Sequence, residues 1–254
     1  MSETLRIMTW NVWFSELARD QRMQELLTYI EELQPDVVGL QELTRYGMDV
    51  LGGPNSILSQ AYQPTPSDAS EIQGYWERIY TKLPIGPRSI RTEYEWTHMG
   101  RGLSVLHSPD LDLVVGATHL ESMDSAETRQ AQASEAFERL DSFGTRNVVF
   151  MGDMNLYDEE TLEPLPTGWV DAWDCLYPHD PGYTRDNKVN AMIGYPTQQR
   201  IDRIFVRSQD YKLQEMELLG LAPLDPKQYD LKTEEPIHPS DHFGLFLQLK
   251  PKAK

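Results

Sequence analysis

Apolar and polar residues recur along this chain with two periods, and these predict short strands and two long helices. The first helix is predicted over residues 20–36, where apolar side chains recur every three or four positions, at Met23, Leu26, Leu27, Ile30 and Leu33. We expect Asp20 to cap this helix and Pro35 to end it. The second helix is predicted over residues 125–143, with Ser125 as its N-cap.

Strands are predicted where short segments are continuously apolar or alternate in polarity. These segments are residues 5–13, 36–42, 75–81, 101–121, 147–155, 200–208 and 241–249. The alternation in the fourth segment is interrupted at HSPD, residues 107–110, so we expect a hairpin there. Residues 44–74 are expected to form a helix plus loops, and residues 156–199 mostly loops.

The distribution of these elements favours one fold class. Strands outnumber helices, and the two clear helices lie far apart in the sequence. We therefore expect an α/β protein made of two packed sheets with helices outside, rather than one parallel sheet. The chain of 254 residues contains no repeat and no linker, so we expect residues 1–254 to form a single domain.

Composition narrows the classes of function and location. The formal net charge of −17 argues against wrapping long duplex DNA, which binds basic surfaces. No apolar run approaches the ~18 residues that a membrane span needs. The first residues, MSETLRIMTWN, do not resemble a leader peptide, and Cys175 is the single cysteine, so we expect no intramolecular disulfide. These features predict an intracellular protein without a membrane partner, nuclear in a eukaryote and cytoplasmic otherwise.

Six apolar segments each carry an acid, an amide or an imidazole near one end. These polar residues are Asn11, Glu42, His119, Asp153 with Asn155, Asp202, and Asp241 with His242. Strand ends at one edge of a sheet converge, and sites commonly lie there. Asn11, Glu42 and Asp241 supply oxygen atoms, which are the ligands that Mg²⁺ prefers.

Each of these residues also has a structural interpretation when it is taken alone. Asn11 could form a turn, and either histidine could be a hydrogen-bonded core residue. Asp202 could pair with Arg200 or Arg203. Only the combination of residue types and positions favours a site.

Two other kinds of site are disfavoured by the sequence. There is no HExxH motif and no cysteine pair, so a zinc site of the usual composition is not expected. Ser240, Asp241 and His242 are adjacent, and adjacent strand residues point to opposite faces. With no GxSxG motif either, a serine hydrolase is not expected.

The motifs around the polar strand ends resemble those of the endonuclease/exonuclease/phosphatase superfamily. They are TWN at 9–11, LQE at 40–42, THLES at 118–122, GDMN at 152–155, DRIF at 202–205 and SDH at 240–242. The segments that carry these motifs follow one another along almost the whole chain, from residue 5 to residue 249. The resemblance implies a four-layer α/β sandwich, with two mixed sheets flanked by helices, and divalent-metal-dependent hydrolysis of phosphoesters.

Longer stretches resemble one branch of this superfamily, the 5′-tyrosyl-DNA phosphodiesterases. They are ATHLESMDSAETRQAQ, GDMNLYDEE, VDAWDCL, GYTRDNKVN, RIDRIFVRS and LLGLAPLD. This resemblance implies a monomer that hydrolyses 5′-phosphotyrosyl-DNA bonds with Mg²⁺, or with Mn²⁺ as a substitute, in the repair of topoisomerase–DNA adducts. The implied partner is a single-stranded or overhanging DNA 5′ end that carries a tyrosyl peptide, and the product keeps a 5′-phosphate.

Other functions remain open at this point. An apurinic endonuclease, an exonuclease, an RNA deadenylase or a lipid phosphodiesterase would share the same fold and motifs. A scaffold that binds phosphate without cleaving it belongs to a different class. Comparing turnover of a 5′-tyrosyl oligonucleotide, an abasic duplex and a lipid head group separates these alternatives.

The resemblance also implies roles for the polar residues. Asp153 would activate the attacking water, and Asn155 would orient it. His119 and His242 would donate hydrogen bonds to the phosphoryl oxygens as negative charge develops. Asp202 would fix the tautomer and the orientation of His242.

The same resemblance implies residues that bind the metal and the substrate. Glu42 would hold Mg²⁺ most directly, with Asn11 and Asp241 on its waters. The substrate-binding residues would be Tyr75, Tyr157, Arg185, Ile193, Tyr195 and Arg203. Two positions depart from the pattern, because Tyr157 replaces an expected basic residue and Arg185 replaces an expected aromatic one. Ile193 and Tyr195 are expected to keep the apolar wall that accepts the DNA end.

Overall fold

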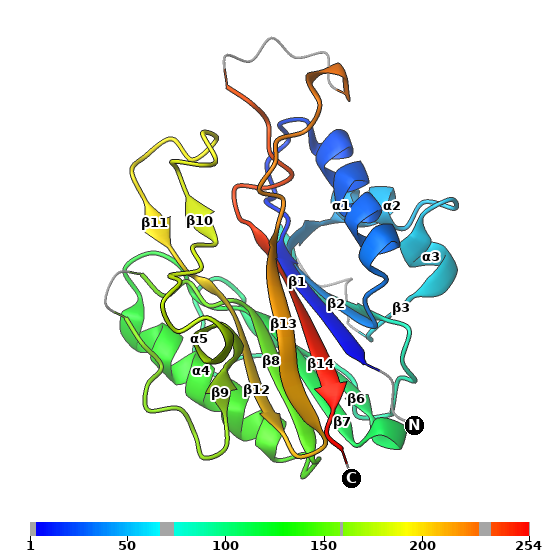
Figure 1. The fold of residues 1–254 in the computed structure, drawn as a ribbon, viewed down its shortest axis with the longest axis vertical. Coiled ribbons are helices and arrows are strands. Elements are labelled where there is room, and N and C mark those ends of the chain that lie inside the picture. Colours follow the sequence, from blue (N-terminus) through cyan, green and yellow to red (C-terminus); the bar gives the residue numbers. More distant parts are fainter. Residues whose placement is uncertain (1–3, 67–73, 158–159, 229–234, 254) are drawn as a thin grey trace.

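Two six-stranded sheets pack face to face, with helices on their outer faces, in the computed structural model of this chain (Figure 1). The structure describes residues 4–66, 74–157, 160–228 and 235–253. The predicted α/β fold, a four-layer sandwich of two mixed sheets flanked by helices, is confirmed. Among the described residues, no helix combines the length and the apolar character that crossing a membrane would require.

The strands of each sheet come from distant parts of the chain. The first sheet has the order β13 (Tyr211–Leu219), β14 (Gly244–Pro251), β1 (Leu5–Asn11), β2 (Val37–Thr44), β4 (Tyr75–Thr81) and β3 (Gln63–Pro64). The second has the order β5 (Arg91–Glu93), β6 (Gly102–Ser108), β7 (Leu113–His119), β8 (Asn147–Asp153), β12 (Asp202–Ser208) and β9 (Val170–Asp171). A separate two-stranded ribbon, β10 (Arg185–Asp186) with β11 (Gln198–Gln199), projects from the sandwich at the upper left of Figure 1.

Helices cover the outer face of each sheet. The first sheet is covered by α1 (Arg19–Leu33), α2 (Arg45–Leu51) and α3 (Ile57–Ala61), and the second by α4 (Ala126–Asp141) (Figure 1). The short α5 (Ala172–Leu176) packs against β12 and β13, and the 3-10 turns are η1 (Pro109–Leu111) and η2 (Pro226–Gln228). The apolar face predicted for the first helix is confirmed, because four of its five residues are buried.

Alternate residues of the central strands face the space between the sheets, as the two-residue period of a strand requires. That inner core contains, among others, Ile7, Val115, Met151, Ile204 and Leu247. The remaining positions face the helices, as Trp10 does under α1 and Phe150 does under α4. Every central strand is therefore buried on both faces, which is why these segments read as continuously apolar.

The pairing pattern brings distant strand ends to one edge of the sandwich. β1 is parallel to β2, and β7 is parallel to β8, so these four strands end on the same side. β12 runs antiparallel to β8, and β14 antiparallel to β1, so these two strands begin on that side. The polar strand ends singled out in the sequence meet there.

Some predicted details are wrong. The N-cap of α1 is Ala18 rather than Asp20, whose carboxylate instead accepts a hydrogen bond from the Tyr46 hydroxyl. Ser125 does occupy the N-cap position of α4, but its side chain makes no capping hydrogen bond. The predicted helix plus loops at 44–74 are α2, α3 and β3, and residues 67–73 lie outside the described residues.

One long strand has no clear signal in the sequence. β13 is an edge strand whose burial follows no strict alternation, since its pairing with β14 shifts register between Leu213 and Glu215. Its solvent side carries charged residues, which blunt an exposed edge but weaken the apolar pattern. Residues 156–199, expected to be mostly loops, also contain α5 and three two-residue strands.

Candidate active site

The inner-facing rows of the strands continue from the apolar core into a cluster of polar side chains. Asn11 lies in the same row as Ile7 on β1, and Asp153 in the same row as Met151 on β8. His119 ends β7, and Asp202 begins β12. The regular alternation of each strand therefore aims these side chains into one buried space between the sheets.

Glu42 reaches this cluster through an irregularity in β2. Val38 and Leu40 face the outer core under α1, so regular alternation would turn residue 42 outward as well. The register between β2 and β4 shifts between Leu40 and Leu43, which marks a β-bulge. Glu42 has a left-handed backbone with a φ of 59°, and its Oε1 accepts a hydrogen bond from Asn11 Nδ2 at 3.1 Å. Such backbone strain at a residue other than glycine is concentrated at functional sites.

Gly152 allows β7 and β8 to approach each other beside the cluster. Its φ is 134°, and a Cβ atom there would lie 2.0 Å from the carbonyl oxygen of Thr118. The register pairs Thr118 with Gly152 and His119 with Asp153. A residue with a side chain would push the strands apart, so the glycine of the GDMN motif keeps His119 and Asp153 side by side.

Asp153 accepts the central hydrogen bonds of the cluster. Its Oδ2 accepts one from Asn11 Nδ2 at 2.9 Å and lies 3.4 Å from His119 Nε2. Its Oδ1 accepts one from the Asn155 backbone N–H at 2.9 Å. Burial, together with the negative charge of Asp202, raises the pKa of Asp153 to about 6. This carboxylate is ionised at neutral pH yet more basic than an ordinary aspartate, which suits a group that accepts a proton.

Asp202 holds His242 in its charged form. Asp202 Oδ2 lies 2.9 Å from His242 Nδ1. Burial lowers the pKa of His242, but the carboxylates of Asp202, Asp241 and Asp153 outweigh this effect and raise the pKa to about 10. At neutral pH His242 is therefore an imidazolium whose Nε2–H can donate. Ser240 is not part of a triad, since its hydroxyl donates to the Asn11 carbonyl oxygen at 2.6 Å.

His119 is a neutral donor, unlike His242. Burial, together with the positive charges of Arg101 and His242, holds the pKa of His119 well below its usual value. Arg101 Nη1 lies 2.8 Å from His119 Nδ1. A guanidinium has no acceptor atom, so Nδ1 must be the unprotonated nitrogen and Nε2 must carry the hydrogen. The site therefore offers one neutral and one charged imidazole donor.

Two carboxylates of the cluster fit a divalent cation. Glu42 is largely buried, and burial raises the pKa of its carboxyl, against the opposing charge of His242. Asp241 Oδ1 is buried and has no hydrogen-bond partner among the described residues. Buried carboxylate oxygens of this kind suit a hard ion such as Mg²⁺. Asn11 turns its amide nitrogen towards Glu42 and Asp153, because its Oδ1 accepts from the Trp13 backbone N–H at 3.0 Å.

A second set of ligand atoms also has a spacing that a cation could bridge. Atoms of Asp153, Asp202 and His242 lie within 4.8 Å of one another. However, the imidazole nitrogen that faces Asp202 is already hydrogen-bonded, and a protonated imidazole cannot ligate a metal. We therefore favour Glu42 and Asp241 as the cation ligands.

Asn155 and Tyr157 form a short hydrogen-bonded pair next to Asp153. Asn155 Nδ2 donates to the Leu120 carbonyl oxygen at 3.0 Å, and its Oδ1 accepts from the Tyr157 hydroxyl at 2.5 Å. One amide hydrogen and one oxygen lone pair of Asn155 remain for a water. Burial raises the pKa of Tyr157 to about 12, so its hydroxyl stays protonated as a donor.

Aromatic side chains flank the cluster where it reaches the surface. The Tyr75 ring lies between Phe14, at a centroid distance of 4.9 Å and an interplanar angle of 2°, and His119, at 6.0 Å. Phe14 is 47% exposed, and its backbone N–H donates to Glu42 Oε2 at 3.0 Å. On another side, the Arg185 guanidinium lies 5.5 Å from the centroid of the exposed Tyr195 ring.

Two residues predicted to bind substrate have other surroundings. Arg203 follows Asp202 and points to the opposite face of β12, where its Nη1 donates to Asp171 Oδ2 at 2.9 Å. Arg200 also pairs with Asp171, so neither arginine pairs with Asp202. Ile193 is buried, with 5% of its surface exposed, so it offers little area for contact with a ligand.

Two buried arginines, which the sequence reasoning missed, support the loops of the site. Arg22 of α1 donates only to backbone carbonyl oxygens, those of Val12, Trp13, Ser15, Leu17 and Pro239. Arg129 of α4 donates to the carbonyl oxygens of Glu121 and Met123 and pairs with Glu160. Each arginine lies four positions before a buried apolar residue of its helix, so a charge within an apolar stripe was the available signal. For Arg101, which contacts His119, the sequence offered no comparable signal.

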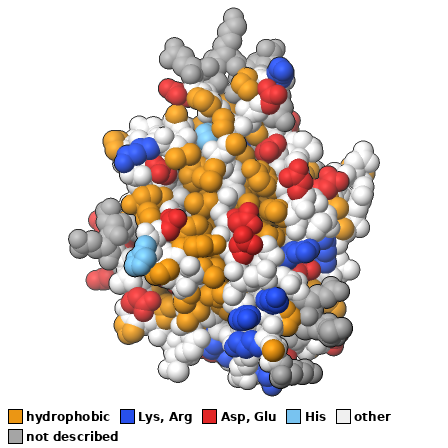
Figure 2. Space-filling model, in the orientation of Figure 1, with side chains coloured by type: hydrophobic (Ala, Val, Ile, Leu, Met, Phe, Trp, Pro, Cys, Tyr) orange, Lys and Arg blue, Asp and Glu red, His pale blue; other side chains and the backbone are white. Residues whose placement is uncertain are grey.

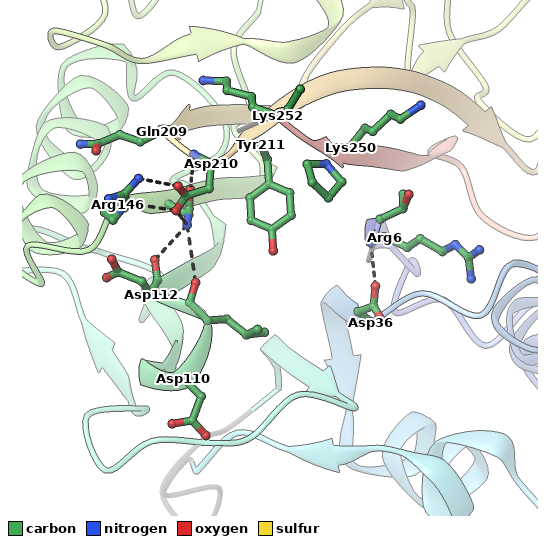
Figure 3. Close-up of a pocket in the computed structure, with 15 residues that line it drawn as sticks. Arg6, Asp36, Asp110, Asp112, Arg146, Gln209, Asp210, Tyr211, Lys250 and Lys252 are labelled. Carbon is green, nitrogen blue, oxygen red and sulfur yellow. Dashed lines mark hydrogen bonds and ion pairs between the residues drawn. The ribbon is translucent and has the colours of Figure 1, made fainter. Parts of the chain in front are cut away.

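A cavity lies at the other end of the same strands. It has a volume of about 1480 Å³, and it is lined by the starts of β1 and β8, the turn between β12 and β13, and the end of β14 (Figure 3). Its lining contains equal numbers of basic and acidic residues, namely Arg6, Arg146, Lys250 and Lys252 and Asp36, Asp110, Asp112 and Asp210. Figure 2 shows basic side chains gathered at this lower end, with acidic ones nearer the middle of the face. Balanced and solvated charges of this kind do not indicate catalysis.

Comparisons with known proteins agree with this geometry. The Endonuclease/Exonuclease/phosphatase family matches residues 8–242. The chain is 27% identical to Tyrosyl-DNA phosphodiesterase 2 of Bos taurus over 95% of its own length and 66% of that protein. It is also 27% identical to the 5′-tyrosyl-DNA phosphodiesterase of Caenorhabditis briggsae, over 66% of its own length and 49% of that protein.

One solved structure is similar over nearly the whole chain. It is D. rerio TDP2 complexed with single strand DNA product, with a TM-score of 0.84 and 26% identity, covering 98% of this chain and 100% of that chain. The chain itself spans about two thirds and about half of the two curated relatives. The match over residues 8–242 includes every residue of the cluster, from Asn11 to His242, and the chain therefore belongs to the Endonuclease/Exonuclease/phosphatase family.

Proposed function

We propose that this chain is a Mg²⁺-dependent phosphodiesterase that hydrolyses 5′-phosphotyrosyl-DNA bonds and leaves a 5′-phosphate. The observation that carries the proposal is the buried cluster at one edge of the sandwich, in which Asn11 and His119 contact a single basic carboxylate, Asp153. The relatives named as tyrosyl-DNA phosphodiesterases support the choice of substrate. We infer that the DNA end is single-stranded or overhanging, as in the D. rerio relative with its single strand DNA product.

Asp153 is the proposed general base. Its pKa of about 6 keeps it ionised at neutral pH and gives it more basicity than an ordinary aspartate. The attacking water loses a proton to Asp153 as it forms a bond to phosphorus. Asn155, whose backbone N–H binds Asp153 Oδ1, uses its remaining amide hydrogen or lone pair to orient that water.

The two histidines stabilise the negative charge that develops on the phosphoryl oxygens. His242 contributes a charged donor and His119 a neutral one, and both are fixed by their neighbours Asp202 and Arg101. Donors that are fixed before the reaction need no reorganisation during it, so their stabilisation is large. A Mg²⁺ ion held by Glu42 and Asp241 would supply further positive charge to the same oxygens.

The leaving group fits a site without a strong general acid. A tyrosine phenol has a pKa near ~10, well below that of an alkyl alcohol. It can therefore leave as a phenolate with hydrogen-bonding assistance alone. The Tyr75 and Phe14 rings beside His119 provide an aromatic surface next to the reacting phosphate.

The direct test is release of tyrosine from a 5′-phosphotyrosyl single-stranded oligonucleotide. We expect turnover with Mg²⁺, none in EDTA, recovery when Mg²⁺ is restored, and no cleavage of the 3′-linked isomer. An abasic duplex, a poly(A) strand and a lipid head group test the other phosphoesterases of this fold. Faster turnover of any of these would replace the proposed substrate, and binding without turnover of any of them would indicate a scaffold.

A further inference from the structure

We propose that Arg185 is a resident counter-cation for Asp241, which weakens cation binding at that carboxylate and provides positive charge to the substrate phosphate. The cation part of the proposal rests only on the site geometry. The substrate part rests on the proposed function. Together they make Arg185 a positioning residue that affects two binding steps in opposite directions.

The backbone holds Arg185 next to Asp241 independently of their ion pair. Arg185 belongs to the β10–β11 ribbon, outside both large sheets. The preceding Thr184 is tied to the cluster on two sides: its hydroxyl accepts from the backbone N–H of Asp202 at 3.1 Å, and its carbonyl oxygen accepts from the Phe243 N–H at 2.7 Å. The ribbon therefore positions the Arg185 guanidinium at the site as firmly as a strand of one of the large sheets would.

Only some of the hydrogen-bond donors of the Arg185 guanidinium have a partner. Arg185 Nη2 donates to Asp241 Oδ2 at 2.9 Å, while Arg185 Nε is buried without a hydrogen-bond partner among the described residues. The other oxygen of Asp241, Oδ1, is also buried without a hydrogen bond there, and it lies 4.0 Å from His242 Nε2. Side-chain exposure is 13% for Arg185 and 12% for Asp241, so solvent screens the pair only weakly. A second negatively charged group, such as a phosphate, could satisfy the free Nε.

The fixed positive charge of Arg185 beside Asp241 has two consequences. It reduces the negative potential at the carboxylate, so a divalent cation binds there more weakly than it would without Arg185. It also leaves a guanidinium, the side chain best suited to phosphate, at the edge of the reacting centre. The Tyr195 ring, 5.5 Å from the guanidinium, stabilises the cation in this position from the solvent side.

The test measures binding of Mg²⁺ and of an oligonucleotide separately in the full chain. The variants are Arg185→Gln, which keeps a hydrogen-bonding side chain without charge, and Arg185→Lys as the charge-matched control. Isothermal titration calorimetry with Mg²⁺, supported by Mn²⁺ titration followed by electron paramagnetic resonance, gives the cation affinity. Fluorescence anisotropy of a 5′-phosphorylated single-stranded oligonucleotide in EDTA gives the affinity for the DNA end.

We expect Arg185→Gln to bind Mg²⁺ about tenfold more tightly and the oligonucleotide about tenfold more weakly, the effect of about one pKa unit of charge interaction. Arg185→Lys should stay within about threefold of the unmodified chain in Mg²⁺ affinity. Circular dichroism melting confirms that each variant folds.

Mg²⁺ affinity that is unchanged or lower in Arg185→Gln would overturn the counter-cation role. A fall in both affinities together would also overturn it, because that pattern indicates a purely structural residue. Unchanged oligonucleotide affinity would overturn the substrate part. Neither titration needs turnover, so their failure is distinguishable from a failure of the proposed phosphodiesterase activity.

Discussion

The two ends of the same strands carry charged side chains in opposite ways. At the cavity end, Arg146 and Asp210 form a two-point ion pair whose side chains are 54% and 41% exposed. At the cluster end, Asp153, Asp202 and His242 are almost completely buried, and Asp202 is hydrogen-bonded to His242. Both ends look equally charged in the sequence, so composition alone cannot distinguish them.

The comparison indicates which charges have a function. Exposed ion pairs contribute between about 0 and 1 kcal/mol to stability and cost little to keep. Buried charges cost several kcal/mol unless other groups compensate them. A fold that keeps Asp153, Asp202 and Asp241 buried at one edge, with the pKa of Asp153 raised, does so because the site uses them.

The largest expected effect comes from Asp153→Asn. Loss of the general base should lower the rate of tyrosine release by about 10³–10⁴-fold. Stability at pH 7 should not fall. The folded-state pKa of Asp153 lies above the ordinary value, so ionisation weakens folding as pH rises from about 4 to 6, and the neutral amide removes this cost. Single-turnover kinetics and thermal melting provide the two measurements. Near-normal turnover by the variant would remove Asp153 from the proposed mechanism.

Removal of the buried arginine behind the cluster should give the next largest effect. Arg22→Met leaves the carbonyl oxygens that Arg22 contacts without their charged donor. We expect a loss of about 3–5 kcal/mol in the free energy of unfolding. Urea denaturation followed by tryptophan fluorescence measures it. A loss below about 1 kcal/mol would mean that these loops hold their conformation without Arg22.

Glu42→Gln tests the cation ligand. We expect tyrosine release to fall by about 10²–10³-fold, as for removal of one transition-state contact, and Mg²⁺ affinity to fall with it. The backbone bulge should persist, because it results from the register shift with β4, and the single carbonyl oxygen of the glutamine can still accept from either Asn11 or the Phe14 N–H. Mg²⁺ calorimetry on the variant is the deciding measurement, and an unchanged Mg²⁺ affinity would place the ion elsewhere.

The pH profile tests the pairing of Asp202 with His242. Activity should rise with pH through about 6 as Asp153 ionises and fall through about 10 as His242 loses its proton. Asp202→Asn removes a carboxylate that raises the His242 pKa, so the alkaline limb should move down by about 1–2 pH units. The profile of kcat/KM and the NMR titration of the imidazole should shift together. An alkaline limb that stays in place would exclude His242 as its source.

The smallest effect is expected at the other end of the strands. Arg146→Met should cost less than about 1 kcal/mol of stability and leave tyrosine release unchanged. It is the matched control for Arg22→Met, since both remove one guanidinium. A large loss of activity in Arg146→Met would mean that the cavity end contributes to function after all.

Sequence patterns predicted most of the fold and the membership of the cluster because both depend on period and residue type. The central strands are buried on both faces, and their apolar runs end in polar residues at the converging edge. The amphipathic helix over 20–36 was visible for the same reason. These features follow from local burial, which the order of residues reports directly.

The rest depends on contacts that no local pattern reports. The bulge that turns Glu42 inward results from a register shift with β4, and β13 is recognisable only through its pairing with β14. Arg101 fixes the His119 tautomer across 18 residues of chain. The ion pair of Arg185 with Asp241 spans 56 residues, and the residue types alone gave no reason to join them.

The pairing of β1 with β14 has a consequence during synthesis of the chain. Asn11 is made before the residues that hold its strand end, because Ser240, which donates to the Asn11 carbonyl oxygen, follows it by 229 positions, and His242, which accepts from Trp10, follows Trp10 by 232 positions. Until then, β1 lacks β14 as its neighbour in the first sheet, and the cluster lacks the imidazolium of His242. A nascent chain therefore carries Asp153 and His119 long before His242 joins them, so the cluster is complete only once translation has passed β14.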